Sequence, residues 1–243
     1  MSSVRQFAGR QLSGLLYAVG GGRAALPAGP ETSAVRHARP SEDRVRAVVA
    51  SLGPRGAVQV DGTTCGSAAL VVTAAAGDPG LARRIERPGA FDLAQLAVKQ
   101  ASTRRALAGL RWPGALGTPP WSAAQVARFG DLTYTHRLVV DSRPSQSVPL
   151  IDLAVAWARS GVPVPLYTGG DTTTGLATAV PRHVVVLTSP DGHALEVYEP
   201  SSGRLHPVDE DGLRTGGGRR PAYGGWSHIT WVLLPVGPQR ARG

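Results

Sequence analysis

The first half of the chain carries apolar residues at helical spacing. Residues 41–43 (Ser-Glu-Asp) suit the N-cap and the first turn of a helix. After them, valine and leucine recur every three or four residues as far as Leu52. The pattern predicts a helix that opens at residues 41–43 and ends before Gly53 and Pro54.

Further segments of the first half predict more helices. Residues 65–76 are almost wholly apolar, so we expect this helix to be buried on all sides. Asp78 and Pro79 suit the cap and the first turn of a short helix. Helical spacing predicts additional helices at residues 91–110, 122–129 and 149–160.

The second half consists of short valine-rich runs separated by Gly, Pro, Asp and Ser. Such runs, with turn signals between them, predict β-strands. The predicted strands are residues 162–167, 183–188, 194–198 and 229–234, with a further candidate at 137–141. Because helices come first and strands later, without βαβ alternation, we expect an α+β fold with an antiparallel sheet.

The chain divides into one long folded unit and two ends. Its 243 residues suit a single domain with a sizeable core. A stretch rich in Gly, Ala and Pro predicts that residues 1–40 form a flexible N-terminal segment. Residues 41–235 are then the domain and 236–243 a basic tail. Within the domain, the Gly- and Thr-rich residues 168–179 are expected to form a loop available for function.

The N-terminal apolar stretch, residues 12–19, makes a poor signal peptide. It is short, broken by Gly14 and followed by Arg23. No apolar run approaches the ~18 residues that a membrane span needs. We therefore expect no membrane span and a cytoplasmic location, with export by a weak N-terminal signal as the alternative.

The formal net charge of +9, from 26 basic and 17 acidic side chains, raises nucleic acid as a partner. This charge lies mainly at the ends. Residues 1–40 carry +4 and residues 204–243 carry +3, which leaves +2 for residues 41–203. No aromatic residues alternate with the terminal arginines, as they do in many nucleic-acid-binding segments. We therefore expect no specific nucleic-acid partner.

The chain has one cysteine, Cys65, which excludes an internal disulfide framework and a cysteine-rich metal site. A Walker loop, a dinucleotide fingerprint and a histidine-rich zinc spacing are all absent. Asp171 and the three threonines after it would bind a metal only with other ligands, and the sequence suggests none. The expectation is a protein with no cofactor and no metal.

Cys65 begins the predicted apolar helix. There, backbone N–H groups and the positive end of the helix dipole stabilise a thiolate over a thiol. Gly66 and Ser67 are small, so another element and a substrate can approach closely. Gln59, six positions earlier, can offer its side-chain amide to an oxyanion beside the backbone N–H of Cys65. An inert buried cysteine on an apolar helix has the same pattern.

His183 begins a predicted strand, and the turn at residues 190–192 leads into the next strand. A hairpin that folds about residues 191–192 sets His183 opposite position 199 or 200. Opposed Cβ atoms lie about 4.5–5.5 Å apart, so Glu199 can hydrogen-bond the imidazole and orient it. The carboxylate also favours the imidazolium, which stabilises a thiolate. Such a pair alone is typical of a surface, and its occurrence together with Cys65 favours catalysis.

Four other histidines are less suited to this role. His136 lies in a strand-like segment and is expected to be structural. His193 lies at a turn and His206 in a polar stretch, where both are expected to be solvated. His228 precedes a late strand and is expected to pack there, with the lining of a cleft as an alternative.

Residues 59–203 resemble the papain-like cysteine peptidases of the C39 type and their C39-like relatives. In that family a Gln-x5-Cys-Gly motif opens the central helix, and a strand-borne His precedes an Asp-Pro at the end of the next strand. The matching residues here are Gln59, Cys65, Gly66, His183, Glu199 and Pro200. Two positions differ: Thr64 stands where bacteriocin-processing members usually have Asp, and Glu199 replaces Asp.

The resemblance implies a papain-like fold, in which a helical first half with a buried Cys-bearing helix packs on an antiparallel sheet. It implies that Cys65 is the nucleophile, His183 the base and Glu199 the residue that orients the imidazole. Gln59 would stabilise the oxyanion. The implied reaction is acyl transfer on a peptide or amide bond of a peptide or protein substrate. It would run through a thioester to water or to another acceptor.

Two other functions stay open on the sequence alone. The domain can be a catalytically silent binding or adaptor module that keeps the same fold. The basic ends can also hold nucleic acid without specificity. The first function predicts a thiol that His183 does not activate, and the second predicts retention on DNA that collapses with modest salt.

Overall fold

The computed structural model describes residues 25–30, 44–53, 56–106, 109–140, 143–170 and 183–237. Several expectations fall outside these residues. They are the flexible segment over most of residues 1–40, the opening of the first helix at 41–43, most of the loop at 168–179 and nearly all of the tail.

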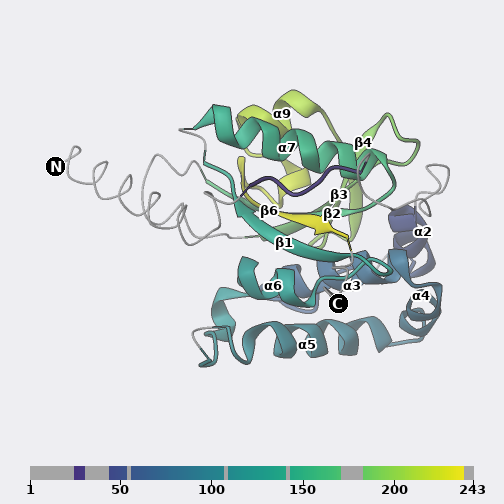
Figure 1. Cartoon of the computed structure of the whole chain (residues 1–243). Helices are drawn as coiled ribbons and strands as arrows, with labels where there is room; N and C mark the ends of the chain where they lie inside the picture. Colours follow the sequence, from purple (N-terminus) through teal and green to yellow (C-terminus); the bar gives the residue numbers. More distant parts are fainter. Residues whose placement is uncertain are drawn as a thin grey trace, which may run out of the picture.

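One antiparallel sheet of six strands forms the centre of the fold, in the order β1-β6-β2-β3-β4-β5 (Figure 1). The strands are β1 (Thr133–Leu138), β2 (Val164–Gly169), β3 (His183–Thr188), β4 (Leu195–Glu199), β5 (Arg204–Val208) and β6 (His228–Val236). Every residue of β2 and of β3 is buried. Both faces of these strands are covered, which explains why their sequences are continuous apolar runs.

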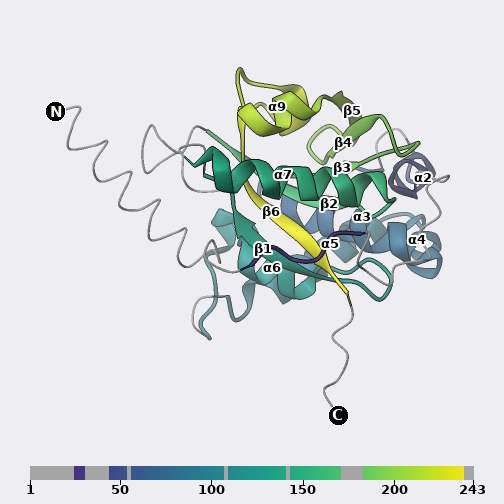
Figure 2. The same ribbon diagram turned by 45° about the horizontal axis from the view of Figure 1, so that its top comes forward.

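Helices cover both faces of the sheet. The helices among the described residues are α2 (Arg44–Ser51), α3 (Cys65–Gly77), α4 (Pro79–Ile85), α5 (Ala90–Thr103), α6 (Pro120–Val126), α7 (Pro144–Arg159) and α9 (Glu210–Thr215). Helices α7 and α9 lie over one face, and α3 and α6 lie over the other (Figures 1 and 2). Helix α5 packs outside α3 and α6. The coarse expectation of helices with an antiparallel sheet is therefore confirmed.

Helix α3 is the buried helix that the sequence predicts. Eleven of its 13 residues are buried, and Ala68, Ala69 and Val72 are wholly inaccessible to solvent. It is enclosed by α2, α5 and β3. Asp78 ends it and caps α4, because its carboxylate accepts hydrogen bonds from the N–H groups of Gly80 and Leu81. The enclosure holds the first residue of α3, Cys65, against the start of β3.

Three element boundaries differ from the prediction. Helix α5 ends at Thr103 rather than near residue 110, and the carbonyl of Thr103 accepts a hydrogen bond from Trp112 N, which turns the chain back. Helix α7 begins at Pro144, so Pro149 lies inside it. The predicted start at 149 was wrong because Pro144 already occupies the N-terminal position that favours proline. Strand β1 begins at Thr133 and ends at Leu138, so it overlaps the predicted residues 137–141 only at its end, because its early residues are polar and lack the apolar signal.

The sequence pattern did not predict β5 or α9. Strand β5 and helix α9 are polar, and β5 is an edge strand that pairs only with β4. Edge strands carry polar residues because one side faces water, so they lack the apolar signal of a central strand. His206 consequently lies on β5 and not in an irregular stretch. Across the described ranges, no helix has the length and apolarity that a membrane crossing requires.

Candidate active site

A pocket of about 280 Å³ lies where α3 and β3 both begin. Its wall combines segments that are far apart in sequence. The polar and aromatic members of the wall are Thr63, Cys65, Thr118, Tyr167, His183 and Trp226. Two of the four residues that the sequence nominates for chemistry, Cys65 and His183, therefore share one cavity.

Cys65 is the first residue of α3, and its thiol is free and only 6% exposed. The preceding residue, Thr64, holds the N-cap position but makes no side-chain cap. Its hydroxyl instead donates to Asp61 O at 2.9 Å and accepts from Asp61 N at 2.9 Å. The first hydrogen bond inside the helix runs from Ala68 N to Thr64 O at 2.8 Å. The N–H groups of the first turn, including that of Cys65, thus have no intrahelical acceptor.

Gly66 keeps the start of α3 close to the opposite wall of the pocket. A Cβ at this position would lie 2.9 Å from the Cβ of Thr118 and 3.4 Å from Cγ2 of Val184. Contacts below 3.0 Å force a neighbour to move. The hydrogen atom of glycine is therefore what lets the helix start, Thr118 and β3 meet around the pocket, as the small residues after Cys65 predict.

His183 stands between the cysteine and a carboxylate. Its Nε2–H donates to Oε1 of Glu199 at 2.6 Å, and both side chains are buried, at 8% and 2% exposure. Cys65 also acts on the ring, because its interaction with the imidazole raises the pKa of His183. Since an imidazole has two ring nitrogens and Nε2 is engaged by Glu199, Nδ1 is the nitrogen left for the thiol. The carboxylate thus holds the imidazole, and the cysteine adds to its basicity.

The electrostatics of the site favour a charged histidine and a charged glutamate. Burial opposes the imidazolium, but hydrogen bonds to Cys65 and Glu199 and the charges of both groups raise the pKa of His183 to about 9. Burial also opposes the carboxylate, yet the hydrogen bonds from His183 and from residues 201–202 lower the pKa of Glu199 to about 2. The backbone N–H groups of Ser201 and Ser202 donate to this carboxylate at 2.7 and 2.8 Å. At neutral pH the pair is therefore imidazolium and carboxylate.

The register of the β3–β4 hairpin differs from the predicted one. Val186 pairs with Tyr198 and Thr188 with Glu196, so continuing the ladder sets His183 level with residue 201 rather than 199 or 200. The expected direct opposition was wrong because the hairpin is centred on Gly192, slightly later in the chain than the prediction assumes. Glu199 is instead a diagonal neighbour of His183 on the same face of the sheet. Its long side chain spans the diagonal.

Gly224 forms the surface on which the imidazole lies. Its backbone is left-handed, with φ of +61°, and a Cβ there would lie 2.4 Å from Cδ2 and 2.7 Å from Nε2 of His183. The turn that contains it is anchored, since the hydroxyl of Thr168 donates to Tyr223 O at 3.0 Å. Only glycine fits this close approach without strain. Sequence reasoning missed Gly224, although the consecutive glycines 224–225 were a signal for it.

Gln59 lies in the loop that leads to Cys65, outside the wall of the pocket. Its Nε2 donates to Asp61 O at 2.7 Å, while its buried Oε1 has no hydrogen-bond partner among the described residues. Its backbone N–H donates to Pro200 O at 2.8 Å, which ties this loop to the residue after Glu199. The structure thus brings Cys65, His183 and Glu199 together and directs the amide of Gln59 to a neighbouring carbonyl.

The other histidines among the described residues lie outside the pocket wall. His136 stacks at 5.5 Å against Trp231, and burial together with Arg137 lowers the pKa of its imidazole. His228 begins β6 and its Nδ1 contacts the hydroxyl of Ser227 at 2.8 Å. Both observations agree with a structural role.

In the part of the chain that the structure describes, no three His, Cys, Asp or Glu side chains group as metal ligands. The groups that the pocket itself offers are a thiol, an imidazole and a helix N-terminus. This set can generate a nucleophile, move a proton at Nδ1 of His183 and stabilise negative charge on a carbonyl oxygen.

No protein family model, curated protein or solved structure matches the chain. The functional assignment of the pocket therefore rests on its own side chains.

Proposed function

We propose that this protein is a cysteine-dependent acyl-transfer enzyme of the papain-like, C39-like type that cleaves a peptide or amide bond. The single observation that carries the proposal is the buried His183–Glu199 hydrogen bond beside Cys65, where Cys65 and His183 line one pocket of about 280 Å³. A nucleophile, a base and a third group that orients the base are the recurring parts of such sites. Joint burial of these three groups around a cavity is unusual for a surface His–Glu pair.

In the first half of the proposed reaction, Sγ of Cys65 attacks the substrate carbonyl carbon, and a carbon–sulfur bond forms. The N–H groups at the start of α3 stabilise the negative charge on the carbonyl oxygen. The carbon–nitrogen bond then breaks, and the proton on Nδ1 of His183 passes to the leaving amine. The product of this half is a thioester on Cys65.

In the second half, neutral His183 takes a proton from water, and the resulting hydroxide adds to the thioester carbon. The carbon–sulfur bond breaks, which releases the acid and restores the thiolate and the imidazolium. Glu199 keeps the ring oriented through Nε2 throughout. An amine in place of water would turn the same steps into a transferase reaction. The oxyanion role of Gln59 requires its amide to leave the carbonyl of Asp61.

Alkylation of Cys65 tests the activated thiol directly. Iodoacetamide or an epoxysuccinyl peptide should label Cys65 near neutral pH faster than it labels an ordinary thiol, and the Cys65→Ser protein should not be labelled. His183→Ala should fall to the rate of an ordinary thiol. His136→Ala, which removes a half-buried histidine outside the pocket, is the matched control and should keep the wild-type rate. Equal labelling of the wild-type and His183→Ala proteins would overturn the proposal and favour a catalytically silent binding domain.

Turnover is tested with a mixture of synthetic peptides followed by mass spectrometry. New termini should appear with the wild-type protein and be absent with Cys65→Ser. An activated thiol without peptide cleavage would contradict the peptidase assignment. The remaining function would then be acyl transfer to another acceptor. Adding primary amines would reveal such a transfer through the appearance of amide products.

A further inference from the structure

A second pocket, of about 570 Å³, lies beside the one that holds Cys65. One wall is the C-terminal half of α5, with Leu96 and Lys99, and the other is residues 111–114, with Arg111 and Trp112. We call it the α5 pocket. The proposed reaction assigns nothing to it.

The linings of the two pockets adjoin at two places. Gly114 of the α5 pocket is followed in the chain by Ala115 of the Cys65 pocket. On the other side, Nζ of Lys99 donates a hydrogen bond to the hydroxyl of Thr63, which lines the Cys65 pocket. Thr63 is two residues from Cys65, so their Cα atoms are at most about 7.6 Å apart. A substrate whose reacting carbonyl lies at Cys65 therefore reaches Lys99 with a neighbouring residue.

The charged residues that line the α5 pocket are Lys99 and Arg111, both cations. Among the described residues, Lys99 pairs with the acid Asp61, whose carboxylate lies 3.8 Å from Nζ of Lys99 and also accepts hydrogen bonds from the N–H and hydroxyl of Thr63. The carboxylate of Asp61 offsets part of the positive charge of Lys99. Arg111 has no hydrogen bond or ion pair with any described residue. Nε1 of Trp112 is a buried donor that also lacks an acceptor among these residues. The wall therefore has a surplus of donors and of positive charge.

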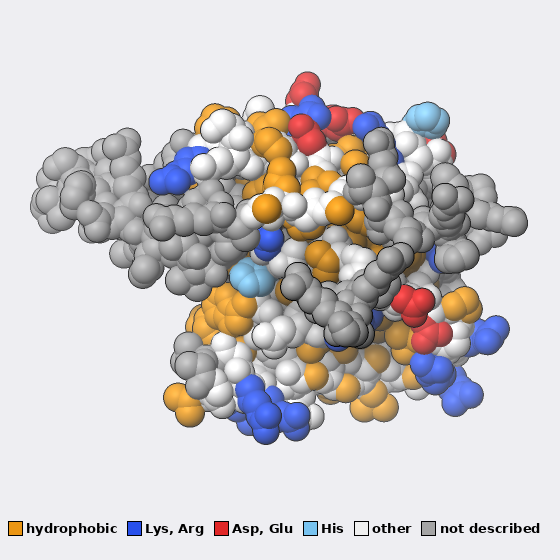
Figure 3. Space-filling model, viewed as in Figure 1, with side chains coloured by type: hydrophobic (Ala, Val, Ile, Leu, Met, Phe, Trp, Pro, Cys, Tyr) orange, Lys and Arg blue, Asp and Glu red, His pale blue; other side chains and the backbone are white. Residues whose placement is uncertain are grey.

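Exposed leucines occur on the same segments: Leu93 and Leu96 on α5, of which Leu96 lines the α5 pocket, and Leu116 at the Cys65 pocket. Leu93 is 70% exposed, Leu96 44% and Leu116 49%. Figure 3 shows hydrophobic side chains along α5 and a group of Lys or Arg side chains near its C-terminal end. Grouped exposed apolar side chains are typical of a binding surface. Their position beside the cations favours an occupant with a carboxylate on an apolar chain over a free inorganic anion.

We propose that the α5 pocket is a substrate subsite that binds a carboxylate within about two residues of the reacting carbonyl, so that acidic peptides are the preferred substrate class. This inference rests on the proposed acyl-transfer function. The carboxylate can be an acidic side chain or the C-terminus of the substrate, because Lys99 and Arg111 recognise the same group in both.

The test uses the full chain and thiol-reactive probes, so that it does not depend on turnover. N-(carboxyalkyl)maleimides of increasing chain length are compared with their carboxamide counterparts in the rate of Cys65 labelling. We expect the acid to react faster than the amide by about two- to five-fold at a chain length that reaches Lys99, an advantage typical of one partly exposed ion pair. Raising the salt concentration should reduce this advantage.

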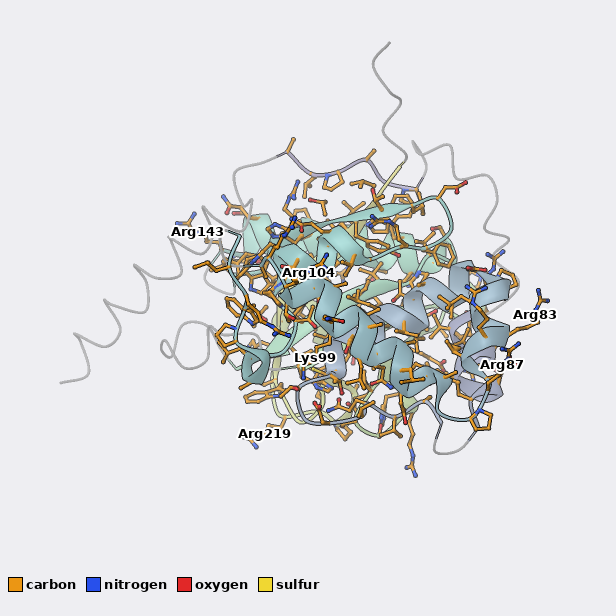
Figure 4. All side chains as sticks on the ribbon, turned by 90° about the horizontal axis from the view of Figure 1, so that it is seen from below. Arg83, Arg87, Lys99, Arg104, Arg143 and Arg219 are labelled. Atoms are coloured by element: carbon orange, nitrogen blue, oxygen red, sulfur yellow. The ribbon has the colours of Figure 1, made fainter. Side chains whose placement is uncertain are left out.

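Arg111→Gln should abolish most of the advantage without altering the rate of the carboxamide probes, because Arg111 holds no other described group. Lys99→Gln should do the same, although it also releases Thr63. The matched control is Arg87→Gln, because Arg87 precedes the N-terminal end of α5, away from Lys99 (Figure 4). An acid-to-amide ratio in Arg111→Gln equal to that in the wild-type protein would overturn the proposal.

Protection of Cys65 by alanine pentapeptides distinguishes the two sources of the carboxylate. One peptide series carries a single Glu with blocked ends, and the other carries no Glu and a free C-terminus. Protection of Cys65 by the first series identifies a side-chain carboxylate. Protection by the second series identifies a terminal carboxylate. Equal protection by fully blocked peptides with Gln would refute the subsite. A charge-dependent ratio without any peptide turnover would support the subsite and refute the peptidase assignment, so the two failures are distinguishable.

Discussion

The ionisation of His183 provides the sharpest test of the candidate site. Burial alone lowers its pKa, and the value of about 9 results from Cys65 and Glu199. Relative to the ordinary value of 6.5, the imidazolium is favoured by about 3 kcal/mol, at about 1.4 kcal/mol for each pKa unit. Either Cys65→Ala or Glu199→Gln should therefore lower the pKa of His183. In the double variant only burial remains, so the histidine should titrate below 6.5.

The titration can be followed by long-range proton–nitrogen NMR, which also reports which ring nitrogen carries the proton. His183→Asn identifies the resonance among the six histidines. The Glu199→Asp protein is a matched control, because it keeps the charge and shortens the side chain that spans the diagonal. An unchanged titration of His183 in Glu199→Gln would show that the carboxylate does not act on the ring.

The remaining predictions concern close packing, pH and burial. Gly224→Ala should slow alkylation of the nucleophile at least tenfold, measured with iodoacetamide, because its Cβ would displace the ring of His183; a wild-type rate would contradict this role. Glu199→Gln should reduce the free energy of unfolding most between pH 4.5 and 6.5, measured with urea. The difference in the free energy of unfolding between the wild-type and variant proteins should shrink as the pH drops towards 2, where the carboxylate gains a proton. It should also shrink as the pH rises through 9, where the imidazolium loses a proton. A difference independent of pH would refute the ionised pair. Leu166→Ala, in the buried β2, should cost about 2–5 kcal/mol in thermal or urea unfolding. The same change at Leu93, which is 70% exposed, should stay within about 0.5 kcal/mol, and equal effects would contradict the core.

The features that sequence alone predicts are those set by local pattern. The all-apolar run after Cys65 has no polar face, so it has to be enclosed, and α3 is enclosed. The valine runs of β2 and β3 likewise have no polar face, and both strands are central. The place of Cys65 at a helix start and of His183 at a strand start follows from these two patterns.

The features that sequence misses depend on contacts between distant segments. Gly224 acts on a histidine 41 positions away, and the neighbouring pair of glycines signals a turn without indicating which side chain lies against it. Gln59 is a second case. Its spacing to Cys65 suggests an oxyanion role, but several acceptors compete for its flexible side-chain amide. In the structure the amide donates to the carbonyl of Asp61, only two residues away.

The His183–Glu199 contact shows why a wrong register can still give the right partners. Side chains alternate between the two faces of a strand, so a shift of one residue separates two side chains and a shift of two keeps them on one face. The turn signal alone left positions 199 and 200 open. Extending the observed pairs, such as Val186 with Tyr198, sets His183 level with residue 201, which has the same parity as 199. The contact then spans a diagonal, and the extra methylene of glutamate relative to aspartate provides the reach, while the N–H groups of residues 201–202 hold the carboxylate at the ring. The departure from the aspartate of the resembling family is therefore compatible with an oriented imidazole in this hairpin.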